Sequence, residues 1–285
     1  MITAYAYAKV NITFEVLGRR RDGYHDITSV LQEIDLKDTL RFESSPSLVI
    51  DCDNADLSSP DNLALKAAKL LKKESGYKGG VKVTLKKGIP VAAGLGGGSS
   101  DAGAALVALN KLWKLKLSAE SLVELAAVLG SDVPYFIRGG TVLAEGRGER
   151  IKPLPPLPES WIVLVRPSVQ VPEMKTKTMY GALSSLHHSK GEHTKRAVAS
   201  IERGVAGDGI QLYNAFDSVA FEVYEGMEWY WKQFMSAGAP EVHLAGAGPT
   251  LFTLLDDRGR AEALYRSLLD LGLETYIVKT ISRSN

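Results

Sequence analysis

The sequence has a single cysteine, Cys52, among its 285 residues, so the chain cannot form an internal disulfide. A lone cysteine fits a protein that stays in a reducing compartment. No apolar run reaches the roughly 18 residues that a membrane-spanning helix needs. Residues 1–5 also lack the basic start and the apolar core of a secretory signal. We therefore expect a soluble, cytoplasmic protein with no membrane partner.

The chain also lacks an excess of charge of either sign. Its 34 lysines and arginines balance 33 aspartates and glutamates, which leaves a formal net charge of +1. Such a balance produces no broad field that would attract a polyanion, so nucleic acid is not an expected partner. Small molecules remain the expected ligands.

Patterned segments predict a mixture of strands and helices. Apolar and polar residues alternate over residues 10–16, which predicts a strand with Lys9 and Asn11 together on its non-core face. Further strands are expected at residues 39–43, 48–52, 81–85, 161–165, 251–255 and 275–278. Helices are expected from Asn62, from Ser99, at residues 118–129 and at about 260–271.

Strands and helices do not alternate regularly along the chain, so the predicted fold class is α+β. Residues 187–195 are polar and are expected to form a mobile loop. Prolines cluster at residues 153–158, which predicts a stiff linker there. The expected domains are therefore residues 1–157 and 158–285.

A glycine-rich segment at residues 94–100 follows the strand at 81–85. Its four glycines allow the backbone to approach a ligand closely, and Ser99, Ser100 and Asp101 then begin a helix whose N-terminal amides favour an anion. No Gly-Lys-Ser/Thr ends the segment, so it is not a Walker A loop. The pattern predicts a phosphate site, and a flexible turn is the alternative.

Other polar residues admit two interpretations each. Asp132 follows a helix stop, where it is either a helix cap or a general base. Lys9 is either solvated or, with Asn11, part of a polar floor. His187, His188 and His193 lack a ligand pattern of carboxylates or cysteines, so no metal site is expected from them. The glycine turn at residues 246–248 is either a tight hairpin or a segment that approaches the phosphate loop.

Five segments in a fixed order resemble the GHMP small-molecule kinases. They are AKVN at residues 8–11, DGYH at 22–25, PVAAGLGGGSSDA at 90–102, GSDVP at 130–134 and GAGPT at 246–250. The resemblance spans nearly the whole chain. It implies a two-domain α+β fold, with an N-terminal domain like the second domain of ribosomal protein S5 and a ferredoxin-like C-terminal domain.

The resemblance also implies an activity and its ligands. The expected enzyme is a phosphotransferase that uses ATP and Mg²⁺ and acts on a cytidine-diphosphate sugar alcohol in isoprenoid precursor synthesis. Lys9 and Asp132 would flank the acceptor hydroxyl, where Asp132 accepts its proton. The implied substrate-binding residues are Asn11, Tyr24, His25, Thr176 and Tyr180. The implied ATP-binding residues are Asn62, Lys87, Pro90, Ala92, Ala93, Gly94, Leu95, Gly96, Gly97, Gly98, Ser99, Ser100 and Asp101. The residues that bind Mg²⁺ are not predicted, and the expected assembly is a monomer or a weak homodimer.

The third motif departs from the usual family pattern. Ala245 and Ala247 stand where hydroxyl residues are common, so Gly246 and Gly248 are expected to contribute backbone shape alone. Three alternatives remain open at this point: a homoserine or mevalonate type of GHMP kinase, a dinucleotide-dependent oxidoreductase, and a nucleotide-binding module without catalysis. The oxidoreductase predicts an acidic residue at the end of a strand about 20 residues after the loop. That region falls instead inside the helix expected at 118–129.

Overall fold

The computed structural model describes residues 1–283 and divides the chain into two compact units. Unit 1 comprises Met1–Ala8, Leu36–Val91 and Gly96–Gly139, and unit 2 comprises Lys9–Asp35, Ala92–Leu95 and Gly140–Asn285. The long strands β1 (Ile2–Arg19) and β2 (His25–Ser45) therefore contribute residues to both units. The domain boundary expected at residue 157 stays a prediction.

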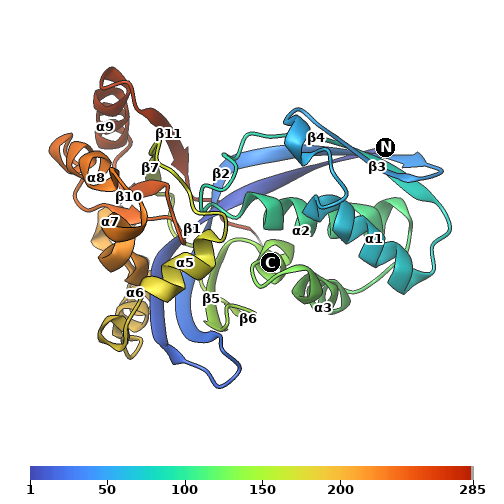
Figure 1. Ribbon diagram of the computed structural model, residues 1–285, viewed down its shortest axis with the longest axis horizontal. Coiled ribbons are helices and arrows are strands. Elements are labelled where there is room, and N and C mark those ends of the chain that lie inside the picture. The colour runs from blue at the N-terminus through green and yellow to red at the C-terminus, as the bar shows by residue number, and fades with distance from the viewer. Residues whose placement is uncertain (284–285) are drawn as a thin grey trace. The chain divides into compact units, whose positions relative to one another are not determined.

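Unit 1 combines a sheet with four helices. The sheet order is β3 (Leu48–Cys52), β4 (Gly80–Lys86), the second half of β2 and the start of β1. In β4 the apolar residues Val81, Val83 and Leu85 are buried and the polar residues between them are exposed. Figure 1 shows the helices of this unit on one side of its strands. They are α1 (Leu63–Ser75), α2 (Gly97–Leu112), α3 (Ala119–Leu129) and α4 (Val133–Arg138).

Side-chain caps fix where two of these helices begin. The amide oxygen of Asn62 accepts a hydrogen bond from the backbone of Ala64, and the Ser118 hydroxyl accepts one from Ser121. The helix starts predicted at these residues are confirmed. Helix α2 begins at Gly97, two residues before the predicted Ser99. Glycine is a poor helix former, which is why the sequence pattern places the start too late.

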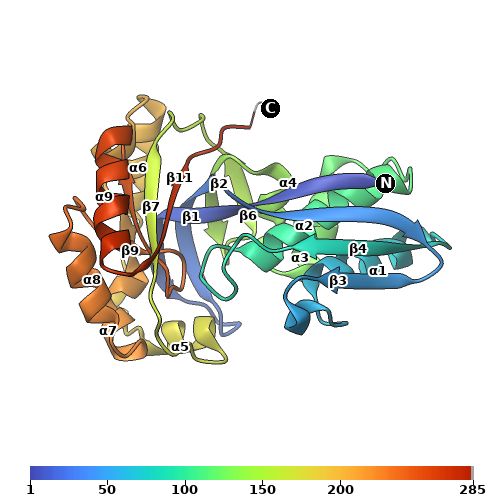
Figure 2. The same cartoon turned by 90° about the horizontal axis from the view of Figure 1, so that it is seen from above.

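Unit 2 contains the rest of β1 and β2 and a second sheet. Strand β2 pairs antiparallel with β5 (Thr141–Gly146), which pairs with β6 (Arg150–Pro153), and β1 pairs parallel with β8 (Tyr213–Asn214). The second sheet has the order β11 (Glu274–Lys279), β7 (Trp161–Arg166), β10 (Leu251–Leu255) and β9 (His243–Leu244). Helix α9 (Arg258–Asp270) packs against β7 and β11 (Figure 2). The remaining helices are α5 (Lys175–Ala182), α6 (Glu192–Glu202), α7 (Ala220–Val223) and α8 (Met227–Ser236).

The polar face of β1 differs from the prediction. Lys9, Asn11, Thr13 and Glu15 are each at most 5% exposed, so this face is buried and the prediction of a non-core face is wrong. Helix α6 explains part of the burial. The Glu15 carboxylate accepts the backbone N–H of Thr194 at 2.7 Å, and the hydroxyls of Thr13 and Thr194 lie 2.9 Å apart.

The mobile loop predicted at residues 187–195 is also wrong in its second half. Residues from Glu192 onward form the first turn of α6, and the His193 ring stacks on Tyr213 with ring centres 3.8 Å apart. The buried Glu15 carboxylate favours a helix start at this place, because it complements the positive end of the helix dipole.

A partly buried histidine in unit 2, His243, lies between two carboxylates. His243 Nδ1 is 2.7 Å from Asp217 Oδ2, and His243 Nε2 is 3.3 Å from Glu241 Oε2. Burial lowers the pKa of His243, but the two carboxylates outweigh that effect and raise this pKa to about 9. Because both ring nitrogens face acceptors, the imidazolium form is the one that this arrangement stabilises.

We expect the stability of the protein to fall in the alkaline range because of His243. Its pKa lies near 6.5 in the unfolded chain, so its stabilisation is fully present below pH 6.5 and is lost as pH rises through about 9. The shift corresponds to about 3 kcal/mol. Urea unfolding at pH 6, 8 and 10 should show this loss in the wild type and a smaller one in His243→Gln. Equal pH dependence in the two proteins would rule out this role.

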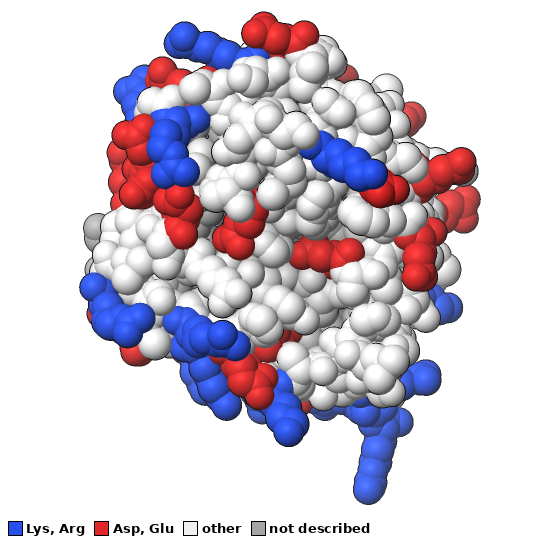
Figure 3. Space-filling model, turned by 90° about the vertical axis from the view of Figure 1, so that its left-hand side faces the viewer, with Lys and Arg blue, Asp and Glu red and all other residues white. Residues whose placement is uncertain are grey.

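Charged side chains of both signs are scattered over the face shown in Figure 3, with uncharged areas between them. This distribution agrees with the balanced composition and offers no single-signed surface there. Within residues 1–283, none of the helices combines the length and the apolar character needed to cross a lipid bilayer.

Candidate active site

We call residues 92–100, the glycine-rich segment and the two alanines before it, the glycine loop. Its first half, Ala92–Leu95, belongs to unit 2 and packs closely on the turn at residues 246–248. Gly94 has a φ of +89°, and a Cβ at this position would lie 2.0 Å from the carbonyl oxygen of Ala245. The Thr250 N–H donates to the Ala93 carbonyl at 3.3 Å. A glycine is therefore required at position 94 both by its backbone conformation and by the lack of space for a Cβ. The turn at residues 246–248 does approach the glycine loop, as one of the two interpretations stated.

The second half of the loop begins helix α2 without a side-chain cap. Gly96 is the N-cap residue, with a φ of +76°, and it makes no capping hydrogen bond. The backbone N–H groups of Gly97, Gly98 and Ser99 have no acceptor among residues 1–283. Unpaired amides at the positive end of a 16-residue helix are suited to an anion. This geometry fits the predicted phosphate site.

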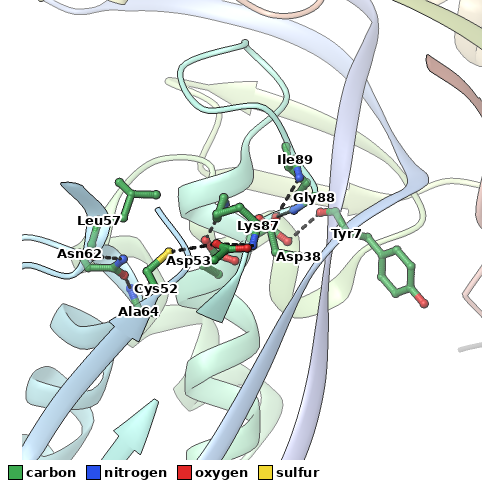
Figure 4. A network of polar contacts seen from close by, with 12 residues as sticks. Tyr7, Asp38, Cys52, Asp53, Leu57, Asn62, Ala64, Lys87, Gly88 and Ile89 are labelled. Atoms are coloured by element: carbon green, nitrogen blue, oxygen red, sulfur yellow. Dashed lines mark hydrogen bonds and ion pairs between the residues drawn. The ribbon is translucent and has the colours of Figure 1, made fainter. Parts of the chain in front are cut away.

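Lys87 lies at the end of β4 in a buried network of charges (Figure 4). Its ammonium contacts Asp38 Oδ2 and lies 3.0 Å from Asp101 Oδ2, and both carboxylates are almost fully buried. Asp38 Oδ1 also accepts the backbone N–H groups of Gly88 at 2.7 Å and Ile89 at 2.8 Å. The network therefore joins β2, the segment before the glycine loop and the first turns of α2.

The charges in this network perturb one another strongly. Burial raises the pKa of Asp101 to about 7, with Lys87 lowering it and Asp38 raising it. Burial lowers the pKa of Lys87, but the two carboxylates outweigh burial and raise it. Asp101 Oδ1 is buried and has no hydrogen-bond partner among the described residues. The predicted contact of Lys87 with ATP stays a prediction, and its ammonium already has two carboxylate partners.

Replacing Lys87 by methionine is expected to lower the free energy of unfolding at pH 8 by about 3–5 kcal/mol, because it leaves two buried carboxylates without their counter-ion. The raised pKa of Asp101 means that the folded state binds a proton more tightly, so the loss should be smaller at pH 5. Chemical unfolding at both pH values measures it. Lys86→Met is the matched control, since Lys86 is exposed and its loss should change stability by at most about 0.5 kcal/mol. Equal losses in the two variants would contradict the network.

Asn62 and Asp53 have local roles in the same region (Figure 4). The Asn62 side chain caps α1 and also donates to the Leu57 carbonyl at 2.9 Å. Asp53 accepts the backbone N–H of Lys87 at 3.0 Å. The predicted adenine-side role of Asn62 stays a prediction beside its observed role as a cap.

Lys9 and Asn11 form the start of a buried chain of hydrogen bonds in unit 2. Lys9 Nζ donates to Asn11 Oδ1 at 2.7 Å, and Asn11 Nδ2 donates to Ser29 Oγ at 2.8 Å. Ser29 in turn donates to the Thr13 carbonyl at 2.5 Å. The Lys9 backbone N–H donates to the carbonyl of Leu95 in the glycine loop at 3.0 Å. The polar-floor interpretation therefore describes this face better than a solvated lysine does.

Asp132 occupies the N-cap position of α4 in unit 1. Its backbone is helical, with φ −84° and ψ −17°, and its side chain makes no capping hydrogen bond. The Asp132 carboxylate therefore does not accept a backbone N–H of the first turn of α4, which is the hydrogen bond that an aspartate cap usually makes. This observation weakens the interpretation of Asp132 as a simple cap.

His25 and Tyr180 come together in unit 2, although 155 positions separate them in the sequence. Their rings stack with centres 4.6 Å apart and an angle of 9° between planes. Thr176 is one turn before Tyr180 on α5, so the two residues share a face of that helix. Tyr24 is about half exposed, with the Arg147 guanidinium 4.7 Å from its ring centre. Burial, His188 and Arg19 lower the pKa of His25, so its ring is mostly neutral at pH 7.

Three residues that the sequence did not indicate hold the turn after β9. Asn214 Nδ2 donates to the carbonyl oxygens of Leu244 and Gly246 at 2.8 Å each. The Tyr224 hydroxyl donates to the carbonyl oxygen of Ala247. Lys175 Nζ donates to Gly248 at 2.5 Å. No motif marks these donors, because each acts on backbone atoms far away in the sequence. The turn keeps its shape without the hydroxyl residues that Ala245 and Ala247 replace.

Comparison with known proteins identifies the family. Models of the GHMP kinases N terminal domain and the GHMP kinases C terminal domain match residues 62–140 and 196–272. A 4-diphosphocytidyl-2-C-methyl-D-erythritol kinase of Dehalococcoides mccartyi is 43% identical over 281 residues, which cover 99% of each chain. One of Pelotomaculum thermopropionicum is 44% identical over 261 residues, 90% of each chain.

The fold agrees with this assignment. A crystal structure of 4-(cytidine 5'-diphospho)-2C-methyl-D-erythritol kinase is 30% identical, with a TM-score of 0.84 over 99% of this chain and 100% of that one. The α+β class and the resemblance to the GHMP kinases are therefore confirmed. The chain belongs to the GHMP kinases and, within them, to the 4-diphosphocytidyl-2-C-methyl-D-erythritol kinases.

Proposed function

We propose that the protein transfers the γ-phosphoryl group of ATP to the 2-hydroxyl of 4-diphosphocytidyl-2-C-methyl-D-erythritol, a step of the non-mevalonate route to isoprenoid precursors. The observation that carries the proposal is the uncapped start of α2, where the amides of Gly97, Gly98 and Ser99 are available to an anion. Two relatives of this protein, 43% and 44% identical to it, support the choice of acceptor.

The glycine loop is proposed to bind the phosphates of ATP through backbone atoms. Amides that are already oriented stabilise charge on the phosphoryl group without reorganising during the reaction. Residues 1–283 contain no group of three or more His, Cys, Asp or Glu side chains arranged to bind a metal. This suits Mg²⁺ on a nucleotide, which is held largely by phosphate oxygens and water. When bound, the ion would neutralise phosphate charge.

Asp132 and Lys9 are proposed to act on the acceptor hydroxyl. The Asp132 carboxylate accepts the hydroxyl proton as the oxygen attacks phosphorus, and the Lys9 ammonium stabilises the negative charge that develops on this oxygen. The buried hydrogen bonds from Lys9 through Asn11 to Ser29 support a fixed position for the ammonium. An ammonium that is already held in place stabilises the negative charge of the transition state without having to reorganise during the reaction.

The cytidine is proposed to bind to the aromatic residues of unit 2. The stacked pair of His25 and Tyr180 offers flat rings, and the mostly neutral His25 can exchange hydrogen bonds with a base without the cost of burying a charge. Thr176 would contact the sugar alcohol side of the substrate. Homoserine and mevalonate carry no base, so these rings support a nucleotide-linked acceptor.

A panel of acceptor alcohols tests this function. The purified protein with ATP and Mg²⁺ should release ADP rapidly with the cytidine-diphosphate acceptor and slowly, at the level of ATP hydrolysis, with homoserine, mevalonate or phosphomevalonate. Turnover with one of the last three alone would assign a different GHMP kinase activity. Nucleotide binding without turnover on any acceptor would instead favour a binding module. The cytoplasmic location and the monomer or weak homodimer stay predictions.

A further inference from the structure

Lys175 connects two turns of unit 2 through its side chain. It is the first residue of α5, and its Nζ donates to the Ala92 carbonyl at 2.8 Å and to the Gly248 carbonyl at 2.5 Å. Ala92 lies in the glycine loop and Gly248 lies in the turn after β9. Asn214 and Tyr224 also donate to this turn, but they are uncharged and the bonds that they donate go to residues 244–247 rather than to the glycine loop. Hydrogen bonds from an ammonium are the stronger kind.

The backbone at Ala92 needs such support. Its φ is +57°, in the left-handed region that residues with a Cβ seldom adopt. A residue stays in that conformation only when its surroundings hold it there. Lys175 bonds to the carbonyl of this same residue, and the ammonium is kept in place although burial and the charge of Lys9 lower its pKa to about 8.

The residues after Ala92 connect its backbone conformation to the proposed nucleotide site at the start of α2. The Ala93 carbonyl accepts the Thr250 N–H, Gly94 packs on Ala245, and the Leu95 carbonyl accepts the Lys9 N–H. Leu95 is followed directly by Gly96, the N-cap of α2. A change of backbone at Ala92 would therefore move the residues that lead into the phosphate-binding amides and that bond to Lys9.

We infer that Lys175 is a positioning residue of the kinase: it holds the glycine loop in its strained, ATP-ready conformation by tying Ala92 to Gly248. The inference rests on the proposed function of the loop. Without the tie, the loop occupies the competent conformation for a smaller fraction of the time, and the apparent affinity for ATP falls by that fraction. At saturating ATP the bound nucleotide keeps the loop in the competent conformation, so the rate of the chemical step changes little.

Lys175→Met tests this inference, since methionine keeps an apolar stem and loses the donor. We expect KM for ATP to rise about tenfold, which corresponds to about 1.4 kcal/mol. We expect kcat to change by less than about threefold and KM for the acceptor to stay constant. Lys177→Met on the same helix is the matched control, because Lys177 is exposed, and it should leave all three constants unchanged. Titration with a non-hydrolysable ATP analogue gives the same comparison without turnover.

A second substitution separates positioning from other roles. Glycine adopts a φ of +57° without strain, so Ala92→Gly in the Lys175→Met background should recover at least about a third of the lost affinity. A fall in kcat of more than tenfold, or no recovery by Ala92→Gly, would overturn the inference in favour of direct contact with the reacting groups. An unchanged KM with lowered thermal stability would also overturn it. Failure of the acceptor panel with intact analogue binding would refute the proposed function and leave this test valid.

Discussion

Replacing Asp132 by asparagine is expected to lower kcat by about 10²–10⁴, the range that a positioned general base contributes. Asparagine keeps the size of the side chain but cannot accept the hydroxyl proton. The substitution should leave the binding of ATP nearly intact, because the proton is transferred only in the chemical step. Steady-state kinetics and analogue titration measure the two effects separately, and the affinity for the ATP analogue should change by less than about threefold.

Asp51→Asn provides the control for this experiment. Asp51 is an exposed residue of β3 in the same unit, and its neutralisation removes the same charge from the protein. We expect its kcat to equal that of the wild type. If Asp132→Asn also retained full turnover, Asp132 would not be the base. If it lost turnover and stability together, Asp132 would have a structural role instead.

Gly94→Ala is expected to lower kcat/KM for ATP by at least about 100-fold, which corresponds to about 2.7 kcal/mol. The new Cβ would lie 2.0 Å from the Ala245 carbonyl oxygen and 2.8 Å from that of Gly248, and the φ of +89° disfavours any residue with a Cβ. Both obstacles are backbone atoms, so the loop itself must move. Kinetics and thermal unfolding of the variant measure the result.

Gly226→Ala distinguishes the collision from the backbone strain. Gly226 has a similar φ of +82°, but a Cβ there would meet nothing within 4 Å. This control should lose about 1 kcal/mol of stability and keep its kinetic constants. If Gly94→Ala behaved in the same way, the close packing of loop and turn would be unimportant for catalysis.

Local signals allowed part of this structure to be predicted from the sequence. Asn62 and Ser118 are good cap residues before apolar periodic segments, and both helix starts were found. The alternation in β4 was equally clear. The glycine loop was recognisable because it needs several glycines in consecutive positions, and such a cluster is visible without knowledge of the fold.

Long-range partners explain what could not be predicted. The burial of the face that carries Lys9 was not predicted, because alternation of polar and apolar residues is typical of a half-buried strand. The helix that covers part of this face follows about 180 residues later. Lys87 was expected near the nucleotide, while Asp38 and Asp101, which contact its ammonium, are 49 and 14 positions away. Within residues 1–283, the hydrogen bonds of Lys175 Nζ go to backbone oxygens, so no side-chain pattern could reveal this residue.

The uncapped start of α2 has a thermodynamic consequence. A helix whose first amides lack acceptors is less stable than one with a capping side chain. An anion that occupies these amides binds the folded state alone, and it raises the free energy of unfolding by RT ln(1 + [L]/Kd). At a ligand concentration 100 times Kd this is about 2.7 kcal/mol. With the phosphates of ATP bound there as proposed, the thermal stability of unit 1 would rise with the nucleotide concentration, and the nucleotide-free protein would be the less stable form.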